Sequence, residues 1–216
     1  MACISASLLA ADFANLAGDV QRAGLAGVDG FHFDMMDGHY VPNIALAPQH
    51  LAALRSYTPL PFDLHLELAN TDQVLSTFQK LAADVILVQW DTITDPFHTF
   101  SLIRSHGGQV GLSLNPDIPL DQVRPYLTQV DRLLLLSVHP GFGGQPMVSG
   151  AAERDFEARR MVETEKPGLS IAVDGGVSLQ NAPGLVRAGA SWLIIGTALF
   201  QAGDMQRFVK DIHNLS

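Results

Sequence analysis

Apolar residues in this chain fall into short runs, separated by longer segments in which apolar positions recur every three or four residues. Runs such as 85–88 (VILV) and 133–136 (LLLL) are apolar throughout, as strands of a parallel sheet are when both of their faces are buried. The pattern predicts eight strands, near residues 3–8, 30–35, 61–67, 85–90, 109–114, 132–138, 170–175 and 192–197.

The segments between these runs have the periodicity of amphipathic helices. Pro119 precedes one of them and Ser178 is expected to act as the N-cap of another, because both residue types are favoured at helix starts. The clearest predicted helices span residues 12–26, 71–83, 120–129 and 178–188.

Eight strand–helix units in 216 residues predict an α/β fold, a single-domain (β/α)₈ TIM barrel that spans residues 1–216. A doubly wound open sheet is the alternative arrangement of the same units. No GxGxxG motif follows the first strand, which disfavours a dinucleotide-binding version of that sheet.

Composition narrows the class of protein further. An apolar fraction of 47% with a mean hydropathy of +0.18 is enough to build a large core. The net charge of −9 and the absence of a Lys or Arg cluster argue against nucleic-acid and membrane partners. A single cysteine, Cys3, excludes an internal disulfide. With no basic leader and no apolar run of ~20 residues, we expect a soluble cytoplasmic protein.

Four polar side chains stand at the downstream ends of predicted strands: His32, Asp34, His65 and Asp174. Residues two apart in a strand point to the same side, so His32 and Asp34 can act together. Enzymes with this fold carry their chemistry at the carboxyl ends of the strands. One such residue alone would more often be a loop cap, but four on converging strands indicate a metal site that also contains acid/base groups. The mixed N/O donor set suits zinc, iron, manganese or cobalt.

Glycine-rich segments follow the last three predicted strands, at residues 140–145 (PGFGGQ), 174–176 (DGG) and 196–197 (GT). Glycine lets the backbone approach an anion closely, and loops in these positions of the barrel commonly bind phosphate. Any one of these glycines could simply make a turn. Together they predict a phosphate site, which would let an acidic protein hold a phosphorylated substrate.

Six segments, spread over nearly the whole chain, carry a resemblance to a known family. They are residues 7–13 (SLLAADF), 32–43 (HFDMMDGHYVPN), 63–66 (DLHL), 114–116 (LNP), 137–145 (SVHPGFGGQ) and 173–176 (VDGG). Through these segments the chain resembles the ribulose-phosphate 3-epimerase family. The resemblance implies a metal-dependent enzyme of pentose phosphate metabolism that interconverts D-ribulose 5-phosphate and D-xylulose 5-phosphate. It also implies association into a homo-oligomer.

Carried over by position, His32, Asp34, His65 and Asp174 match the family's metal ligands, with zinc as the default ion. Asp34 and Asp174 match its two acid/base residues. The resemblance implies that substrate and phosphate contacts come from Ser7, His65, Gly141, Phe142, Gly143, Gly144, Asp174, Gly175, Gly176, Gly196 and Thr197. Epimerisation beside a ketone requires one group to remove a proton and another to return one on the opposite face, and two carboxylates can do this.

The chain departs from the family near the expected site. Glu67 and Leu136 stand where the family usually has methionine, His139 where it has asparagine, and Gln89 where it commonly has histidine, while Met36 is retained. Met36, Glu67, Leu136 and His139 are therefore candidates to face the substrate. Neutral drift and a changed sugar specificity, for instance toward D-allulose 6-phosphate, both fit these changes.

Two other classes of function remain as alternatives. A non-catalytic sugar-phosphate-binding barrel would be expected to have lost some of the four polar residues, which are all present. A cofactor-free aldolase or synthase on a phosphate-binding barrel is disfavoured because no lysine stands at a predicted strand end, as Schiff-base chemistry would require.

Overall fold

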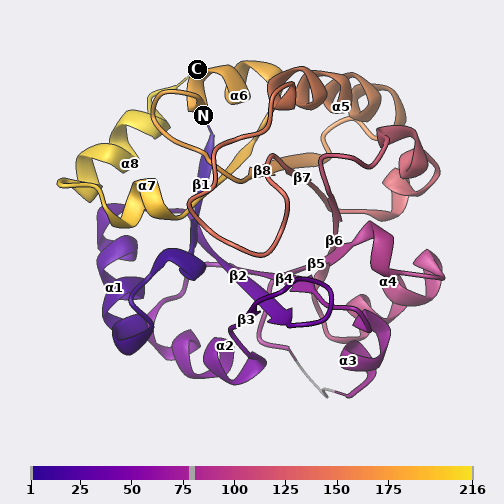
Figure 1. Cartoon of the computed structure of the whole chain (residues 1–216), viewed down its shortest axis with the longest axis horizontal. Coiled ribbons are helices and arrows are strands. Elements are labelled where there is room, and N and C mark those ends of the chain that lie inside the picture. The colour runs from indigo at the N-terminus through magenta and orange to yellow at the C-terminus, as the bar shows by residue number, and fades with distance from the viewer. Residues whose placement is uncertain (1, 78–80, 216) are drawn as a thin grey trace.

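A computed structural model of the chain describes residues 2–77 and 81–215. Its centre is a closed ring of eight parallel strands (Figure 1), because β1 pairs with β9 on one side and with β2 on the other. This confirms the predicted (β/α)₈ barrel. In ring order the strands are β1 (Cys3–Ser7), β2 (Gly30–Asp37), β4 (Phe62–Glu67), β5 (Val85–Gln89), β6 (Gln109–Leu114), β7 (Arg132–Leu136), β8 (Ser170–Asp174) and β9 (Trp192–Ile195).

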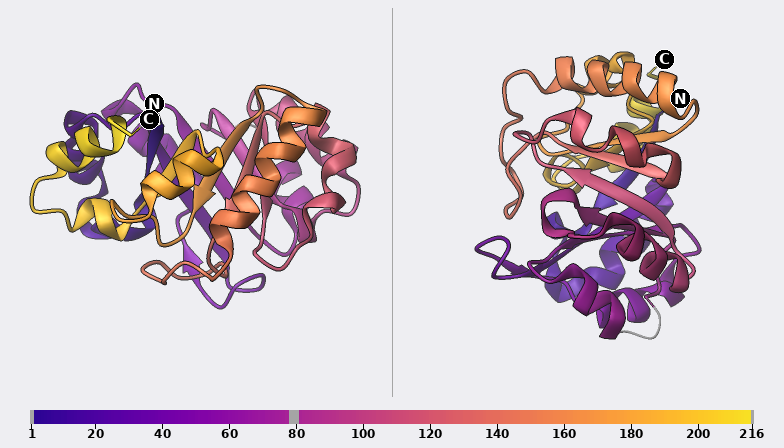
Figure 2. Two further views of the ribbon diagram at one scale, coloured as in Figure 1. Left: turned by 90° about the horizontal axis from the view of Figure 1, so that it is seen from above. Right: turned by 90° about the vertical axis from the view of Figure 1, so that its right-hand side faces the viewer.

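Helices surround this ring on its outer side (Figure 2), and a short strand, β3 (Ile44–Ala45), pairs antiparallel with the end of β2. The helices are α1 (Leu16–Ala26), α2 (Pro48–Leu54), α3 (Thr71–Thr77), α4 (Pro96–Ser105), α5 (Ala151–Glu165), α6 (Ala182–Ala188), α7 (Thr197–Phe200) and α8 (Met205–His213).

Alternation along each strand separates the helix-facing core from the barrel interior. Phe31 and Phe33 of β2 are fully buried in the core cluster shared with the helices. His32 and Asp34, one residue out of phase, therefore point into the barrel. Because alternate residues of a strand face opposite sides, polar residues at every second position near the end of a strand all point into the barrel.

The barrel interior is filled below the strand ends. An apolar layer there contains Val85, Leu87, Leu134, Ala172 and Ile194, with Trp192 packed against it. Toward the amino ends of the strands, Arg132 Nη1 donates to Asp63 Oδ2 at 2.6 Å, and the guanidinium stacks on the ring of Trp192 at 4.3 Å. Side chains thus close the barrel at that end.

Prolines explain why one helix prediction was wrong and another was correct only in part. Residues 120–129 form two 3₁₀ segments, Leu120–Gln122 and Arg124–Gln129, since Pro125 has no N–H for an α-helical hydrogen bond. The helix predicted for 178–188 begins only at Ala182, with Asn181 rather than Ser178 as its N-cap residue. Pro183 is thereby placed in the first turn, where a missing N–H costs little.

The other two helix predictions were correct in part. Within 12–26, Asp12 accepts a hydrogen bond from the amide of Ala14 and caps a 3₁₀ turn, and α1 follows from Leu16. Gly27, at φ +97°, then ends α1 in the left-handed conformation. Within 71–83, α3 occupies Thr71–Thr77, and residues 78–80 lie outside the described part of the chain.

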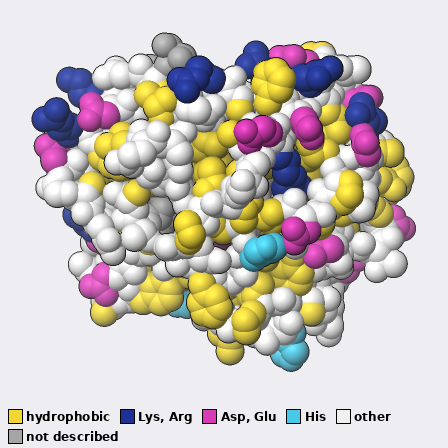
Figure 3. All heavy atoms as spheres, turned by 45° about the horizontal axis from the view of Figure 1, so that its top comes forward, with side chains coloured by type: hydrophobic (Ala, Val, Ile, Leu, Met, Phe, Trp, Pro, Cys, Tyr) yellow, Lys and Arg dark blue, Asp and Glu magenta, His cyan; other side chains and the backbone are white. Residues whose placement is uncertain are grey.

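Acidic and basic side chains are interspersed on the face that Figure 3 shows, with hydrophobic groups scattered between them. Among the helices of the described residues, none combines the length and the apolar character needed to cross a bilayer.

Candidate active site

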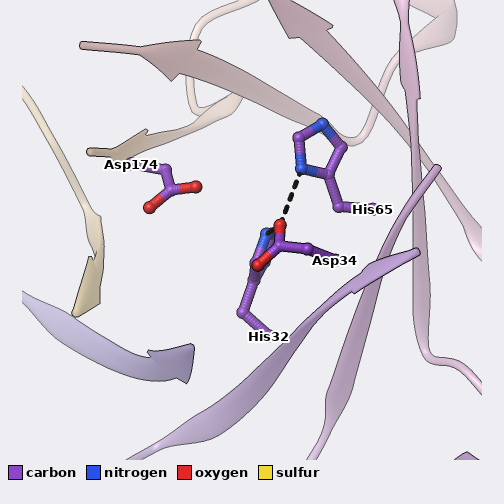
Figure 4. Close-up of side chains that lie close together, drawn as sticks. All are labelled: His32, Asp34, His65 and Asp174. Carbon is purple, nitrogen blue, oxygen red and sulfur yellow. Dashed lines mark hydrogen bonds and ion pairs between the residues drawn. The ribbon is translucent and has the colours of Figure 1, made fainter. Parts of the chain in front are cut away.

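The carboxyl ends of three strands bring the four predicted side chains together (Figure 4). His32 and Asp34 come from β2, His65 from β4 and Asp174 from β8. Asp34 and His65 are direct partners in the β2–β4 register, so their inward-facing side chains meet. One ligand atom from each of the four residues lies within 4.8 Å of the other three. The sequence-predicted quartet is therefore one cluster.

Asp34 is the centre of the hydrogen-bonding network. Its Oδ1 is 3.1 Å from His32 Nε2 and 3.1 Å from His65 Nδ1, and its Oδ2 accepts from Ser7 Oγ at 3.2 Å. Burial alone would raise the pKa of this carboxyl, but the adjacent imidazoles outweigh burial and hold the pKa of Asp34 well below its usual range. Asp34 is the ionised carboxylate of the site.

Asp174 lies in the opposite electrostatic situation. Burial and the negative charge of Asp34 raise the pKa of Asp174 above its ordinary value, with His32 acting in the other direction. Two carboxyl groups a few ångströms apart with pKa values driven in opposite directions are a natural pair of base and acid.

The two histidines also differ. Burial lowers the pKa of His32 by itself, yet the contact with Asp34 raises the pKa of His32 to about 9. Burial lowers the pKa of His65 below its ordinary value, so the ring of His65 is neutral. These directions hold for the cluster without a cation.

The donor atoms fit a divalent transition metal. Two imidazole nitrogens and two carboxylates converge from separate residues, which is the ligand chemistry of zinc, iron, manganese and cobalt sites. Gln89 lies behind His65 with its Nε2 3.1 Å from His65 Nε2, as outer groups that orient a ligating histidine do. A divalent metal is compatible with this cluster.

A cavity of about 300 Å³ opens over the two carboxylates. Ser7 contributes to its wall beside Asp34 and Asp174, and so do all the predicted glycine-loop residues, namely Gly141, Phe142, Gly143, Gly144, Gly175, Gly176, Gly196 and Thr197. His65 is fully buried and lies outside the lining. The carboxylates and the glycine loops therefore serve one cavity.

Of the four candidates to face the substrate, Met36, Glu67 and Leu136 line this cavity. His139 does not. Its side chain is 63% exposed and its Nδ1 lies 3.5 Å from Asp117 Oδ2, beside a separate cavity. The difference arises because residue 139 lies beyond the end of β7, where the period of two no longer fixes the direction of a side chain.

Close packing explains the glycine at position 176. Its φ is +65°, and a Cβ atom there would lie 2.7 Å from the Met147 amide nitrogen and 3.0 Å from the Gln145 carbonyl oxygen. Only glycine fits this contact between the loop after β8 and the loop after β7.

The sequence did not predict that two distant loops meet at the mouth of the cavity. The loop after β2 and the loop after β7 project from the same end of the barrel (Figure 2, left), and Asn43 Nδ2 donates to the Gly141 carbonyl at 2.7 Å. Asn43 belongs to the segment 32–43 that carries the family resemblance, which was the available signal.

Comparison with known proteins gives consistent results. The family model described as "Ribulose-phosphate 3 epimerase family" matches residues 3–200. Ribulose-phosphate 3-epimerase of Bacillus subtilis is 35% identical, with 97% of each chain covered. The chloroplastic ribulose-5-phosphate-3-epimerase of Arabidopsis thaliana is 39% identical, and the match covers 97% of this chain and 75% of that protein.

Solved structures support the fold alone. The 3-hexulose-6-phosphate synthase of Salmonella typhimurium superposes with a TM-score of 0.70 at 16% identity, covering 99% of this chain and 97% of that one. With the family model, the curated relatives and the barrel in agreement, the protein is an epimerase acting on carbohydrates, and the chain belongs to the ribulose-phosphate 3-epimerase family.

Proposed function

We propose that the protein interconverts D-ribulose 5-phosphate and D-xylulose 5-phosphate by inverting the configuration at C3. The observation that carries this proposal is the pair Asp34 and Asp174, which share one cavity with glycine-rich loops suited to a phosphate. Relatives at 34–39% identity are named for this reaction.

The two carboxyl groups are the proposed acid and base. In one direction the Asp34 carboxylate accepts the C3 proton and the Asp174 carboxylic acid donates a proton to the other face of the planar enediolate. In the reverse direction the two residues exchange roles. In the cluster without a cation, the pKa values of the two groups shift in opposite directions, which is compatible with this division.

A hydrogen bond orients the carboxylate group of Asp34. Ser7 Oγ donates to Asp34 Oδ2 at 3.2 Å, a hydrogen bond that does not use the histidine nitrogens needed for a cation, so the carboxylate is oriented before the sugar binds. Because the carboxylate is already oriented, less conformational entropy is lost on reaching the transition state.

His32, Asp34, His65 and Asp174 are the residues that would hold a divalent cation, for which zinc is our proposal. Such a cation would polarise the ketone oxygen and stabilise the negative charge that develops on it.

The phosphate is proposed to lie against the loops at Gly143–Gly144, Gly175–Gly176 and Gly196–Thr197, all of which line the cavity. Backbone N–H groups can bind an anion there without a basic side chain. This arrangement accounts for phosphate binding by a chain with a net charge of −9.

The test is solvent isotope exchange. Metal-loaded protein in D₂O should incorporate deuterium at C3 of D-ribulose 5-phosphate while D-xylulose 5-phosphate forms. Asp34→Asn and Asp174→Asn should each reduce turnover by about 10²–10⁴-fold, the range that general acid/base catalysis contributes per group. Wild-type-like turnover in both variants would refute the two-carboxylate mechanism.

A second substrate is favoured by one observation: a carboxyl side chain, Glu67, lines the cavity where relatives with methionine present an apolar surface. The alternative is C3 epimerisation of another ketose phosphate such as D-allulose 6-phosphate. Comparing kcat/KM for the two sugars decides between them, and a higher value for D-allulose 6-phosphate would replace our proposed substrate.

A further inference from the structure

We propose that Glu67 binds the hydroxyl group on C1 of the ketose phosphate and so selects substrates that carry it. This inference rests on the proposed function and assigns to Glu67 a role in specificity. It follows from where Glu67 lies in the cavity, from an oxygen atom that lacks a partner, and from the position of the glycine loops.

Glu67 is the last residue of β4, two positions beyond His65 and on the same inward face. It is only 3% exposed and lines the cavity beside Asp34. Its partner in the β2–β4 register is Met36, another cavity-lining residue. Glu67 therefore belongs to the wall of the cavity one step nearer to the mouth than His65.

One carboxyl oxygen of Glu67 lacks a hydrogen-bond partner among the described residues. Oε1 lies 3.5 Å from His65 Nδ1, whereas the buried Oε2 has no hydrogen-bond partner among the described residues. A buried carboxyl oxygen without a partner is unfavourable. A ligand in the cavity that offers a hydroxyl group would satisfy it.

The ring places Glu67 directly across from the proposed phosphate site. In the eight-strand order, β4 and β8 are four strands apart in either direction. Gly175 and Gly176 directly follow β8, while Glu67 ends β4. The phosphate and the carboxyl group of Glu67 therefore occupy opposite walls of the cavity.

A ketose 5-phosphate bound between these walls has only one end left for Glu67. Its phosphate is on C5 and its C3 must reach Asp34 and Asp174, so the C1 hydroxymethyl group extends toward β4. The C1 hydroxyl can both donate and accept a hydrogen bond, and it can therefore pair with Glu67 whether or not the carboxyl group holds a proton. A methionine at this position offers only a weakly accepting sulfur.

The experiment compares two sugars that differ only at C1. D-xylulose 5-phosphate and 1-deoxy-D-xylulose 5-phosphate share the ketone, the C3 proton and the phosphate. The rate of deuterium exchange at C3 in D₂O is measured for both, as kcat/KM, with wild-type protein, Glu67→Met, Glu67→Leu and Glu67→Gln. His139→Asn is the matched control, because His139 is exposed and does not line the cavity.

Wild-type protein should prefer the hydroxylated sugar by about tenfold to a hundredfold, the effect of leaving a buried hydrogen-bonding group without its partner. Glu67→Met and Glu67→Leu should reduce this preference to less than about threefold, which corresponds to loss of that single hydrogen bond. Glu67→Gln, which keeps a hydrogen-bonding side chain, should retain most of the preference, and His139→Asn all of it.

Folding of each variant is checked by its thermal transition, and either apolar variant suffices for the comparison. An unchanged preference in a folded apolar variant overturns the role of Glu67 while leaving the epimerase proposal intact. Failure of the wild type to exchange the C3 proton of either sugar overturns the proposed function and this inference with it.

Discussion

Replacing Gln89 should weaken metal binding although Gln89 is not itself one of the proposed metal ligands. In the structure without a cation, the ionised Asp34 can only accept, so His65 Nδ1 carries the hydrogen and donates to Asp34 Oδ1. His65 Nε2 then accepts from Gln89 Nε2 at 3.1 Å. Binding a cation through Nδ1 requires the opposite tautomer, with the hydrogen on Nε2.

Gln89 can serve both tautomers by rotating its amide. Its Oε1 is buried without a partner among the described residues, and so is the hydroxyl of Ser113, its neighbour in the β5–β6 register. After rotation, Oε1 accepts from His65 Nε2, and Nε2 of the amide turns away from the histidine. Because His65 is fully buried, water cannot take over this function.

The size of the effect follows from this burial. Gln89→Leu leaves the Nε2–H of metal-bound His65 unpaired, and loss of such an outer partner typically lowers metal affinity by about tenfold to a hundredfold, or about 1.4–2.7 kcal/mol. We therefore expect the dissociation constant of Gln89→Leu for Zn²⁺ to be about one to two orders of magnitude higher than that of the wild type.

The assay is a competition titration against a chromophoric zinc chelator, which reports affinity independently of activity. Val88→Ala is the matched control: Val88 is fully buried on the same strand but packs in the core shared with the helices. It should lower the free energy of unfolding and leave zinc affinity unchanged. A zinc affinity of Gln89→Leu within about twofold of wild type, well below the expected range, would refute the reasoning.

Three further changes should act elsewhere in the protein. Gly176→Ala should raise KM for the sugar phosphate, because the added Cβ would displace the loop after β7. Gly184→Ala is the control, since an added Cβ there meets no atom within 4 Å, and its KM should not change. Steady-state kinetics measures both. Burial raises the pKa of Asp155 to about 7, so the folded protein favours the protonated side chain. The stability that this preference gives is complete at low pH and is lost as the pH rises from about 4 to 7. Asp155→Asn should therefore gain stability relative to wild type between pH 5 and pH 8, by at most about 4 kcal/mol in urea unfolding. Asp63→Asn leaves the buried Arg132 without its carboxylate partner, and should lower the free energy of unfolding by about 3–5 kcal/mol while kcat/KM stays within a few-fold of wild type.

The fold could be predicted because its main signals are local. The apolar runs at 85–88 and 133–136 are buried on both faces, and burial on both faces is what a parallel barrel demands. Helix boundaries were less predictable, since Pro125 and Pro183 change where a helix can begin or continue.

The cluster of four could be predicted for a similar reason. His32 and Asp34 lie two apart on one strand, and the strand order of the barrel brings His65 next to them. The partners of these residues could not be predicted in the same way. The contact of Gln89 with His65 depends on side-chain rotamers, and the hydrogen bond from Asn43 to Gly141 joins loops 98 residues apart.

The closed lower end of the barrel has a consequence for the order of events in turnover. Among the described residues, Arg132, Asp63 and the apolar layer above them fill the barrel interior below the cavity, and the cavity is lined by residues at and beyond the carboxyl ends of the strands. An ion that approaches the four side chains through this cavity would pass the place where the sugar is proposed to lie. If the sugar phosphate binds as proposed, it would cover the four side chains, and an ion taking this route would bind before the sugar and leave after the product. The shape of the barrel would then be enough to give an ordered sequence of binding.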